Sequence, residues 1–188
     1  MAGCGGSGDR SRPADGPRPV PIPTGVGPRF LPPSYGSAVA HAAPVARSRC
    51  RRGERRLFVA HVELFARGRG VVVPAGIGVA PPRRRSGAFV RSGRCEYPLR
   101  THAPTGVVEV ATRQPATLGD LFAIWGQPLS RRRLAGFAAR GGPGVRAFVD
   151  GAPAGDPRAV RLRPHAQIVL VVGPPVPVHG SYRFPLGE

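Results

Sequence analysis

The stretch TLGDLFAIWGQPLS, residues 117–130, decides the fold because it contains every signal needed for one helix. Thr117 can cap the first turn, and Asp120, three residues later, can complete a capping box. Gly126 and then Pro128 end the helix. Four large apolar residues recur with helical spacing on one face: Leu118, Leu121, Phe122 and Trp125. We therefore predict a short amphipathic helix with Trp125 buried in the core.

Short apolar runs on both sides of the helix predict strands. LFVAHVELF (57–65) and VVVPAGIGV (71–79) predict a β-hairpin, in which Pro74 marks an edge or a bulge. Residues 80–105 predict a long loop, and 130–142 a weak helical turn or a loop. Further strands are expected at 106–111, 145–151, 160–162 and 167–173. This order predicts an α+β fold, a small mixed β-sheet with one main helix, of the β-grasp (ubiquitin-like) type.

The first 56 residues differ in composition from the rest of the chain. Residues 1–36 contain 8 Gly and 8 Pro, and residues 37–56 add no apolar periodicity. Such a segment cannot bury enough apolar surface to fold. We therefore expect a disordered tether at 1–56 and a single domain at 57–188, followed to the end by a Pro-rich extended segment.

The formal net charge is +18, and all 28 basic residues are arginine. A basic surface attracts nucleic acid, anionic lipid or acidic polymers without sequence specificity. Two triplets at expected loop positions are the candidate polyanion-binding residues: Arg83, Arg84, Arg85, Arg131, Arg132 and Arg133. An ordinary solvated basic surface is the alternative. Few aromatic residues accompany the charge, so sequence-specific nucleic-acid recognition is not predicted.

Three cysteines, Cys4, Cys50 and Cys95, form no CxxC motif and no metal-ligand spacing, so a disulfide framework is not indicated. No apolar run reaches the length of a membrane span. Met1-Ala2-Gly3-Cys4 resembles the end of a bacterial lipoprotein signal, with Cys4 as the lipidated residue if the true start lies upstream. The alternative is an ordinary N-terminus with a chance cysteine, in a cytoplasmic protein.

Several blocks give residues 57–185 a resemblance to uncharacterised actinobacterial secreted proteins and lipoproteins. The blocks are VPAGIGV (73–79), CEYPLRTH (95–102), GVVEV (106–110), TLGDLFAIWGQPLS (117–130), VRAFVDG (145–151) and YRFP (182–185). The family pattern has H-x-H in the first strand, C-x-Y-x-L-H-T-H-D in the loop and G-x-x-H-x-E in the next strand. The resemblance therefore implies a metal site in this region.

This sequence differs from the family pattern mainly at the histidine positions. The candidate metal ligands are His61, Cys95 and His102, with Glu63 and Glu109 where histidines would stand. Imidazole, thiolate and carboxylate can bind zinc or copper, the candidate metals. Arg100 stands where another histidine would be, and its fixed charge opposes a second cation. The alternative places His61 and Glu63 on a solvent-facing sheet surface and Cys95 in the core.

Enzymatic chemistry has little support in the sequence. Cys95 and His102 could form a thiolate nucleophile pair, but no completed catalytic constellation is present. We therefore predict a non-catalytic extracytoplasmic binding or accessory module with a degraded metal site. Its partners would be anionic lipid or a cell-surface polymer. The alternative is a basic protein that binds nucleic acid or other polyanions non-specifically.

Overall fold

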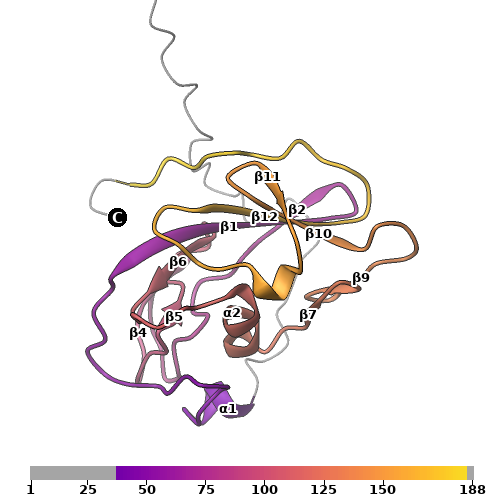
Figure 1. Ribbon diagram of the computed structural model, residues 1–188. Helices are drawn as coiled ribbons and strands as arrows, with labels where there is room; N and C mark the ends of the chain where they lie inside the picture. Colours follow the sequence, from indigo (N-terminus) through magenta and orange to yellow (C-terminus); the bar gives the residue numbers. More distant parts are fainter. Residues whose placement is uncertain (1–36, 186–188) are drawn as a thin grey trace, which may run out of the picture.

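The computed structural model describes residues 37–185 and shows a mixed β-sheet with one main helix (Figure 1). The helical elements are α1 (Ser37–Ala40), α2 (Leu118–Trp125) and the 3₁₀ turn η1 (Pro157–Ala159). The strands are β1 (Phe58–Ala66), β2 (Arg69–Val71), β3 (Arg84–Ser86), β4 (Phe89–Ser92), β5 (Leu99–Arg100), β6 (Val107–Val110), β7 (Leu129–Ser130), β8 (Arg133–Leu134), β9 (Phe137–Ala138), β10 (Val145–Val149), β11 (Ala152–Ala154) and β12 (Gln167–Val172). The predicted α+β class is confirmed.

The main sheet has the strand order β11-β10-β12-β1-β6-β5, with β2 also paired to β1. β1 and β12 lie at its centre and pair in parallel, whereas the other pairs are antiparallel. β6 pairs with the first half of β1 and β2 with its last residues. The chain forms a hairpin (β1 and β2), then helix α2, and then strand β12, which pairs in parallel with β1. This order is the β-grasp plan that the sequence predicted.

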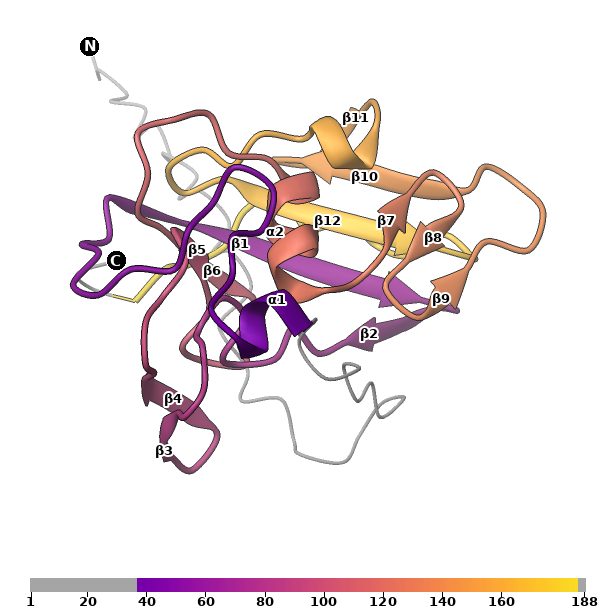
Figure 2. The same cartoon turned by 90° about the horizontal axis from the view of Figure 1, so that it is seen from below.

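Helix α2 packs on one face of this sheet, as Figure 2 shows from below. Thr117 caps it by accepting from the Asp120 N–H, and the Asp120 carboxylate accepts from the Thr117 N–H at 2.9 Å. Gly126 ends the helix with φ 73°, a left-handed conformation that favours glycine. Trp125 and Phe122 are each 1% exposed and lie in the same cluster as the inward residues of β1 and β12. The predicted helix and its buried face are confirmed.

The opposite face of the sheet is covered by residues 174–185, which we call the C-terminal strap. Figure 1 shows the strap, in yellow, crossing the sheet on the side away from α2. Val59 and Val169 point to this side because side chains alternate along a strand, yet both are 0% exposed. The Tyr182 ring stacks on His61 with 3.5 Å between ring centroids. The strap is therefore part of the packed domain.

Several predicted elements differ from those observed. The second hairpin strand ends at Val71, and the 71–79 run continues as turns around Pro74, Gly76 and Gly78. A Cβ on Gly78 would lie 2.1 Å from the Leu99 carbonyl oxygen, so the chain passes too close for any side chain. The predicted long loop contains β3, β4 and β5, and 130–142 forms the small β7-β8-β9 sheet. Residues 160–162 form only an isolated bridge, Thr117 to Arg161.

The predicted domain boundary at residue 57 is wrong. Val39 is 1% exposed and belongs to the main core, and the Tyr97 hydroxyl donates to the Ala43 carbonyl. Residues 37–56 therefore pack on the domain although they carry no periodic apolar pattern. The rest of the predicted tether, residues 1–36, lies outside the described residues.

Candidate functional site

Four charged residues on β5, β6 and the loop around them form one half-buried group, which we call the ion cluster: Glu96, Arg100, His102 and Glu109. β5 and β6 bring Arg100 directly opposite Glu109, so the two side chains share a face of the sheet. Arg100 Nε lies 3.0 Å from a Glu109 carboxylate oxygen and 3.1 Å from one of Glu96. His102 lies between the same two carboxylates, at 3.1 Å from Glu109 and 3.3 Å from Glu96.

This arrangement favours protonated His102 and ionised Glu96 and Glu109. The hydrogen bonds from His102 to Glu109 and Glu96 raise the pKa of His102 to about 9. The His102 hydrogen bond holds the pKa of Glu96 below its ordinary value. Burial opposes ionisation of Glu109, but His102 and Arg100 outweigh it and lower its pKa. At neutral pH the cluster therefore holds two cations and two carboxylates that neutralise each other.

The contacts within the ion cluster argue against the predicted metal site. His102 and Glu109, two predicted ligands, do meet, but both are bound to internal partners and the Arg100 guanidinium lies among them. A metal cation here would face the fixed charge of Arg100, whose Nε lies 3.0 Å from the Glu109 carboxylate. Within residues 37–185, no group of three or more His, Cys, Asp or Glu side chains is arranged to hold a metal ion. The chemistry of this donor set fits an internal ion network instead.

Cys95 is bonded to Cys50, with 5.4 Å between their Cα atoms. The expectation that no disulfide is indicated is therefore wrong, and Cys95 is neither a thiolate ligand nor a nucleophile while this bond exists. The bond joins residues 45 positions apart, and no motif spacing marks it. It forms because residues 50–52 run beside 94–96, where the Arg51 N–H donates to the Glu96 carbonyl at 2.9 Å. Cys4, the predicted lipidation site, lies outside the described residues.

His61 and Glu63, the other two predicted ligands, point toward the C-terminal strap. His61 is 3% exposed, and its two ring nitrogens lie 2.6 Å from the Gln167 side-chain oxygen and 2.8 Å from the Thr105 carbonyl. Burial lowers its pKa despite these acceptors. Glu63 pairs with His179 of the strap at 2.9 Å. The structure thus joins Glu63 to a histidine that the prediction left out.

Gly106 explains how the chain passes over the His61 ring. Its φ is +83°, and a Cβ there would lie 3.0 Å from His61 Nε2 and 2.4 Å from the Val62 carbonyl oxygen. A side chain at this position would collide with β1 and displace the ring. His61 is therefore a packed core histidine rather than an open ligand.

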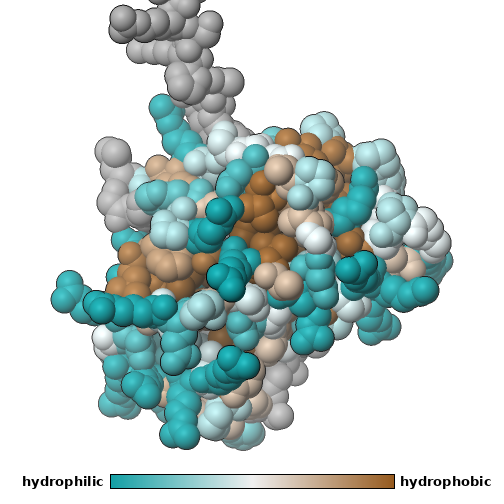
Figure 3. Space-filling model, viewed as in Figure 1, coloured by the Kyte–Doolittle hydropathy of each residue, from teal (hydrophilic) through white to brown (hydrophobic). Residues whose placement is uncertain are grey.

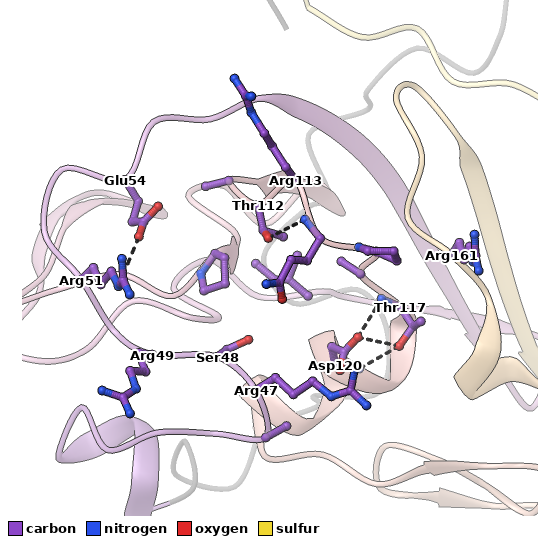
Figure 4. Close-up of a pocket in the computed structure, with 17 residues that line it drawn as sticks. Arg47, Ser48, Arg49, Arg51, Glu54, Thr112, Arg113, Thr117, Asp120 and Arg161 are labelled. Atoms are coloured by element: carbon purple, nitrogen blue, oxygen red, sulfur yellow. Dashed lines mark hydrogen bonds and ion pairs between the residues drawn. The ribbon is translucent and has the colours of Figure 1, made fainter.

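A pocket of about 1030 Å³ lies between residues 46–54, the segment 111–117 and the first turn of α2 (Figure 4). Five arginines line it: Arg47, Arg49, Arg51, Arg113 and Arg161. Its two acids are already engaged, since Asp120 caps α2 and Glu54 lies 3.9 Å from Arg51. The pocket therefore carries a net positive charge at an open, solvent-reachable surface. Sequence reasoning missed it because three of the arginines fall in the segment predicted to be tether.

The predicted polyanion-binding triplets lie apart from this pocket. Arg84 and Arg85 are exposed on β3, whereas Arg83 Nε donates to the Val79 carbonyl at 2.6 Å and so fastens the base of the hairpin. Arg131, Arg132 and Arg133 are exposed at the turn between β7 and β8. The two triplets thus lie on two different hairpins.

Comparison with known proteins adds no relative. No protein-family model, no curated protein and no solved structure matches this chain. The family resemblance therefore stays a prediction based on its motifs. Among residues 37–185, no helix has both the length and the apolar character that crossing a bilayer requires.

Proposed function

We propose that this chain is an exported, non-catalytic binding module that holds a polyanion in the arginine-lined pocket. The ligand class is a polymer with phosphate or carboxylate groups, such as those of a cell surface. The observation that carries the proposal is the pocket itself, with five arginines against two acids that already have partners. Guanidinium groups bind phosphate and carboxylate through paired N–H donors, which suits them to this ligand class.

The architecture around the pocket supports a binding role. The Cys50–Cys95 bond and the Arg51–Glu96 backbone bridge hold the wall that carries Arg47, Arg49 and Arg51. Arg47, Arg49, Arg113 and Arg161 form no ion pair with a carboxylate among residues 37–185. Figure 4 shows that these residues come from different segments around the pocket, with the Arg49 and Arg113 side chains pointing outward at its rim. A fixed wall loses little backbone freedom when an anion binds, so the ordering cost falls on the arginine side chains.

The disulfide also supports the exported location. Disulfides persist in oxidising compartments and are rare in the cytosol of most organisms. Cys4 is the remaining cysteine and is the candidate for lipid attachment in this proposal. Figure 3 shows hydrophilic side chains around a central hydrophobic area on this face.

The test is binding of inorganic polyphosphate to the full oxidised chain at a series of salt concentrations. Arg47→Ala/Arg49→Ala/Arg113→Ala should weaken binding and lower the salt slope by about 2, at about 0.7 for each lost phosphate contact on a flexible chain. The matched control is Arg132→Ala/Arg133→Ala/Arg140→Ala, which removes the same charge from exposed positions elsewhere. Equal losses in the two triple variants would show non-specific attraction and would refute a pocket site.

A further inference from the structure

The β3–β4 hairpin stands apart from the main sheet and forms its own two-stranded sheet. Figure 2 shows it projecting at one end of the molecule, away from α2 and the central strands. Ser86 pairs with Phe89 across a two-residue turn, so Phe89 lies at the tip. The hairpin is therefore the convex part of this end of the surface.

The tip combines one exposed aromatic side chain with several cations. Phe89 is 47% exposed, and the Arg91 guanidinium carbon lies 5.6 Å from the centre of its ring. Arg84 and Arg85 are exposed on the neighbouring strand, and Arg85 pairs with Val90, so it lies on the other face of the hairpin from Phe89 and Arg91. Residues 81–95 contain five arginines in all and no acidic residue. An exposed phenylalanine alone is common on protein surfaces, but one surrounded by cations on a projecting turn is a specific combination.

The base of the hairpin is fixed to the domain. Val90 is 0% exposed and packs with Ala75 and Val79 in a small core of its own. The Val90 N–H donates to the His102 carbonyl at 2.9 Å, and Arg83 binds the Val79 carbonyl. The fold therefore presents Phe89 on a supported turn rather than on a loose loop, which lowers the entropy lost on docking.

We propose that this hairpin docks tip-first on an anionic lipid surface, with Phe89 entering the interfacial region and the arginines on its two faces, Arg91 on one and Arg85 on the other, reaching lipid phosphates. The charges match an anionic headgroup layer, and an apolar side chain among cations is the pattern of interfacial binding. Single-stranded nucleic acid is the other partner with such chemistry, but it is bound in grooves lined by successive aromatic residues. The hairpin instead offers one ring on a convex tip. This inference takes its compartment from the proposed function and is independent of the arginine-lined pocket.

The experiment measures binding of the full oxidised chain to vesicles of phosphatidylcholine, with and without phosphatidylglycerol. Phe89→Ala should weaken binding to the mixed vesicles by about tenfold, because an apolar side chain no longer leaves water. Arg84→Ala/Arg85→Ala should weaken it by about 25-fold at low salt, at about fivefold for each arginine near the surface. Added salt should shrink the arginine effect and leave the Phe89 effect.

Two matched controls separate docking from general loss of charge or apolar surface. Leu57→Ala removes a side chain that is 50% exposed outside the hairpin, and Arg132→Ala/Arg133→Ala removes two charges from another hairpin. Both should bind the mixed vesicles within about twofold of the unmodified chain, since neither site faces the membrane in this orientation. Because Phe89 is half exposed, its variant should keep the thermal midpoint of the unmodified chain.

The outcomes distinguish this inference from the proposed pocket. Vesicle binding that is unchanged by Phe89→Ala would overturn the inference. A Phe89→Ala variant that lost binding to single-stranded DNA and kept binding to vesicles would assign the hairpin to nucleic acid instead. Loss of polyphosphate binding in the Arg47/Arg49/Arg113 variant with normal, Phe89-dependent vesicle binding would support both sites. Failure of the unmodified chain to bind polyphosphate, with Phe89-dependent vesicle binding retained, would refute only the pocket.

Discussion

Replacing both Cys50 and Cys95 with serine tests whether the disulfide holds the N-terminal segment on the domain. The bond closes a loop of 45 residues, and a loop of this length lowers the entropy of the unfolded chain by an amount worth about 4 kcal/mol. Contacts such as Val39 in the core stay available without the bond. Engineered and native bonds often contribute less than the loop estimate, so we expect a loss of about 2–4 kcal/mol in unfolding free energy.

The assay is urea unfolding followed by fluorescence of Trp125, which is buried and is the only tryptophan in the chain. Cys4→Ser is the matched control, because it removes a thiol and leaves the bond, and it should unfold like the unmodified chain. Protein produced without lipid attachment at Cys4 should show, when denatured and unreduced, one free thiol from its three cysteines. Three free thiols, or equal stability of the double serine variant and the unmodified chain, would refute the reasoning.

Three further predictions follow from the packing and the charges. Raising the pH from 6.5 to about 9 should remove the stabilisation from charged His102, whose folded pKa of about 9 lies above the ordinary 6.5. His102→Gln should flatten this dependence by about 1–2 kcal/mol after solvent screening, in urea unfolding at each pH. Trp125→Ala should lower the free energy of unfolding by about 3–5 kcal/mol in the same assay, and a normally folded variant would contradict its burial. Tyr182→Ala should hydrate His61 and move its lowered pKa up toward 6.5, as measured by NMR titration; an unchanged pKa would show that the strap does not seal this ring.

Helix α2 and the central strands could be predicted because their signals are local. The Thr117–Asp120 capping box, the apolar face and Gly126 all lie within one short segment, and the structure contains each of them. β12 is a run of six consecutive buried residues, as expected for a central strand with both faces covered. The order of these elements was sufficient to predict the α+β class and the β-grasp plan.

The disulfide and the packed segment 37–56 could not be predicted because they depend on contacts between distant residues. Cys50 meets Cys95 because the fold places the 94–97 segment beside residues 50–52. The strap is a similar case, since the sequence predicts an extended Pro-rich end but not the stack of Tyr182 on His61. Composition alone classified residues 37–56 as tether, whereas the disulfide, the buried Val39 and hydrogen bonds such as that from Arg51 to Glu96 hold them in place.

The ion cluster, whose residues suggested a metal site, also helps to hold the wall of the arginine-lined pocket. Arg100 binds Glu96 and Glu109 and also donates from Nη2 to the Glu54 carbonyl at 2.9 Å. Glu54 lines the pocket, and Arg56, two residues later, lies 4.0 Å from Glu109. The guanidinium thus supplies the positive charge between carboxylates that a metal would supply, and it adds a directed bond to the segment that forms the pocket wall. Loss of Arg100 would leave two half-buried carboxylates with His102 between them and only the more distant Arg56 beside Glu109, at a cost of several kcal/mol by analogy with other broken buried pairs. The disulfide at Cys50 and the ion cluster at Glu54 therefore fix the same wall at two points, which is why we place the binding site at the pocket and not at the cluster.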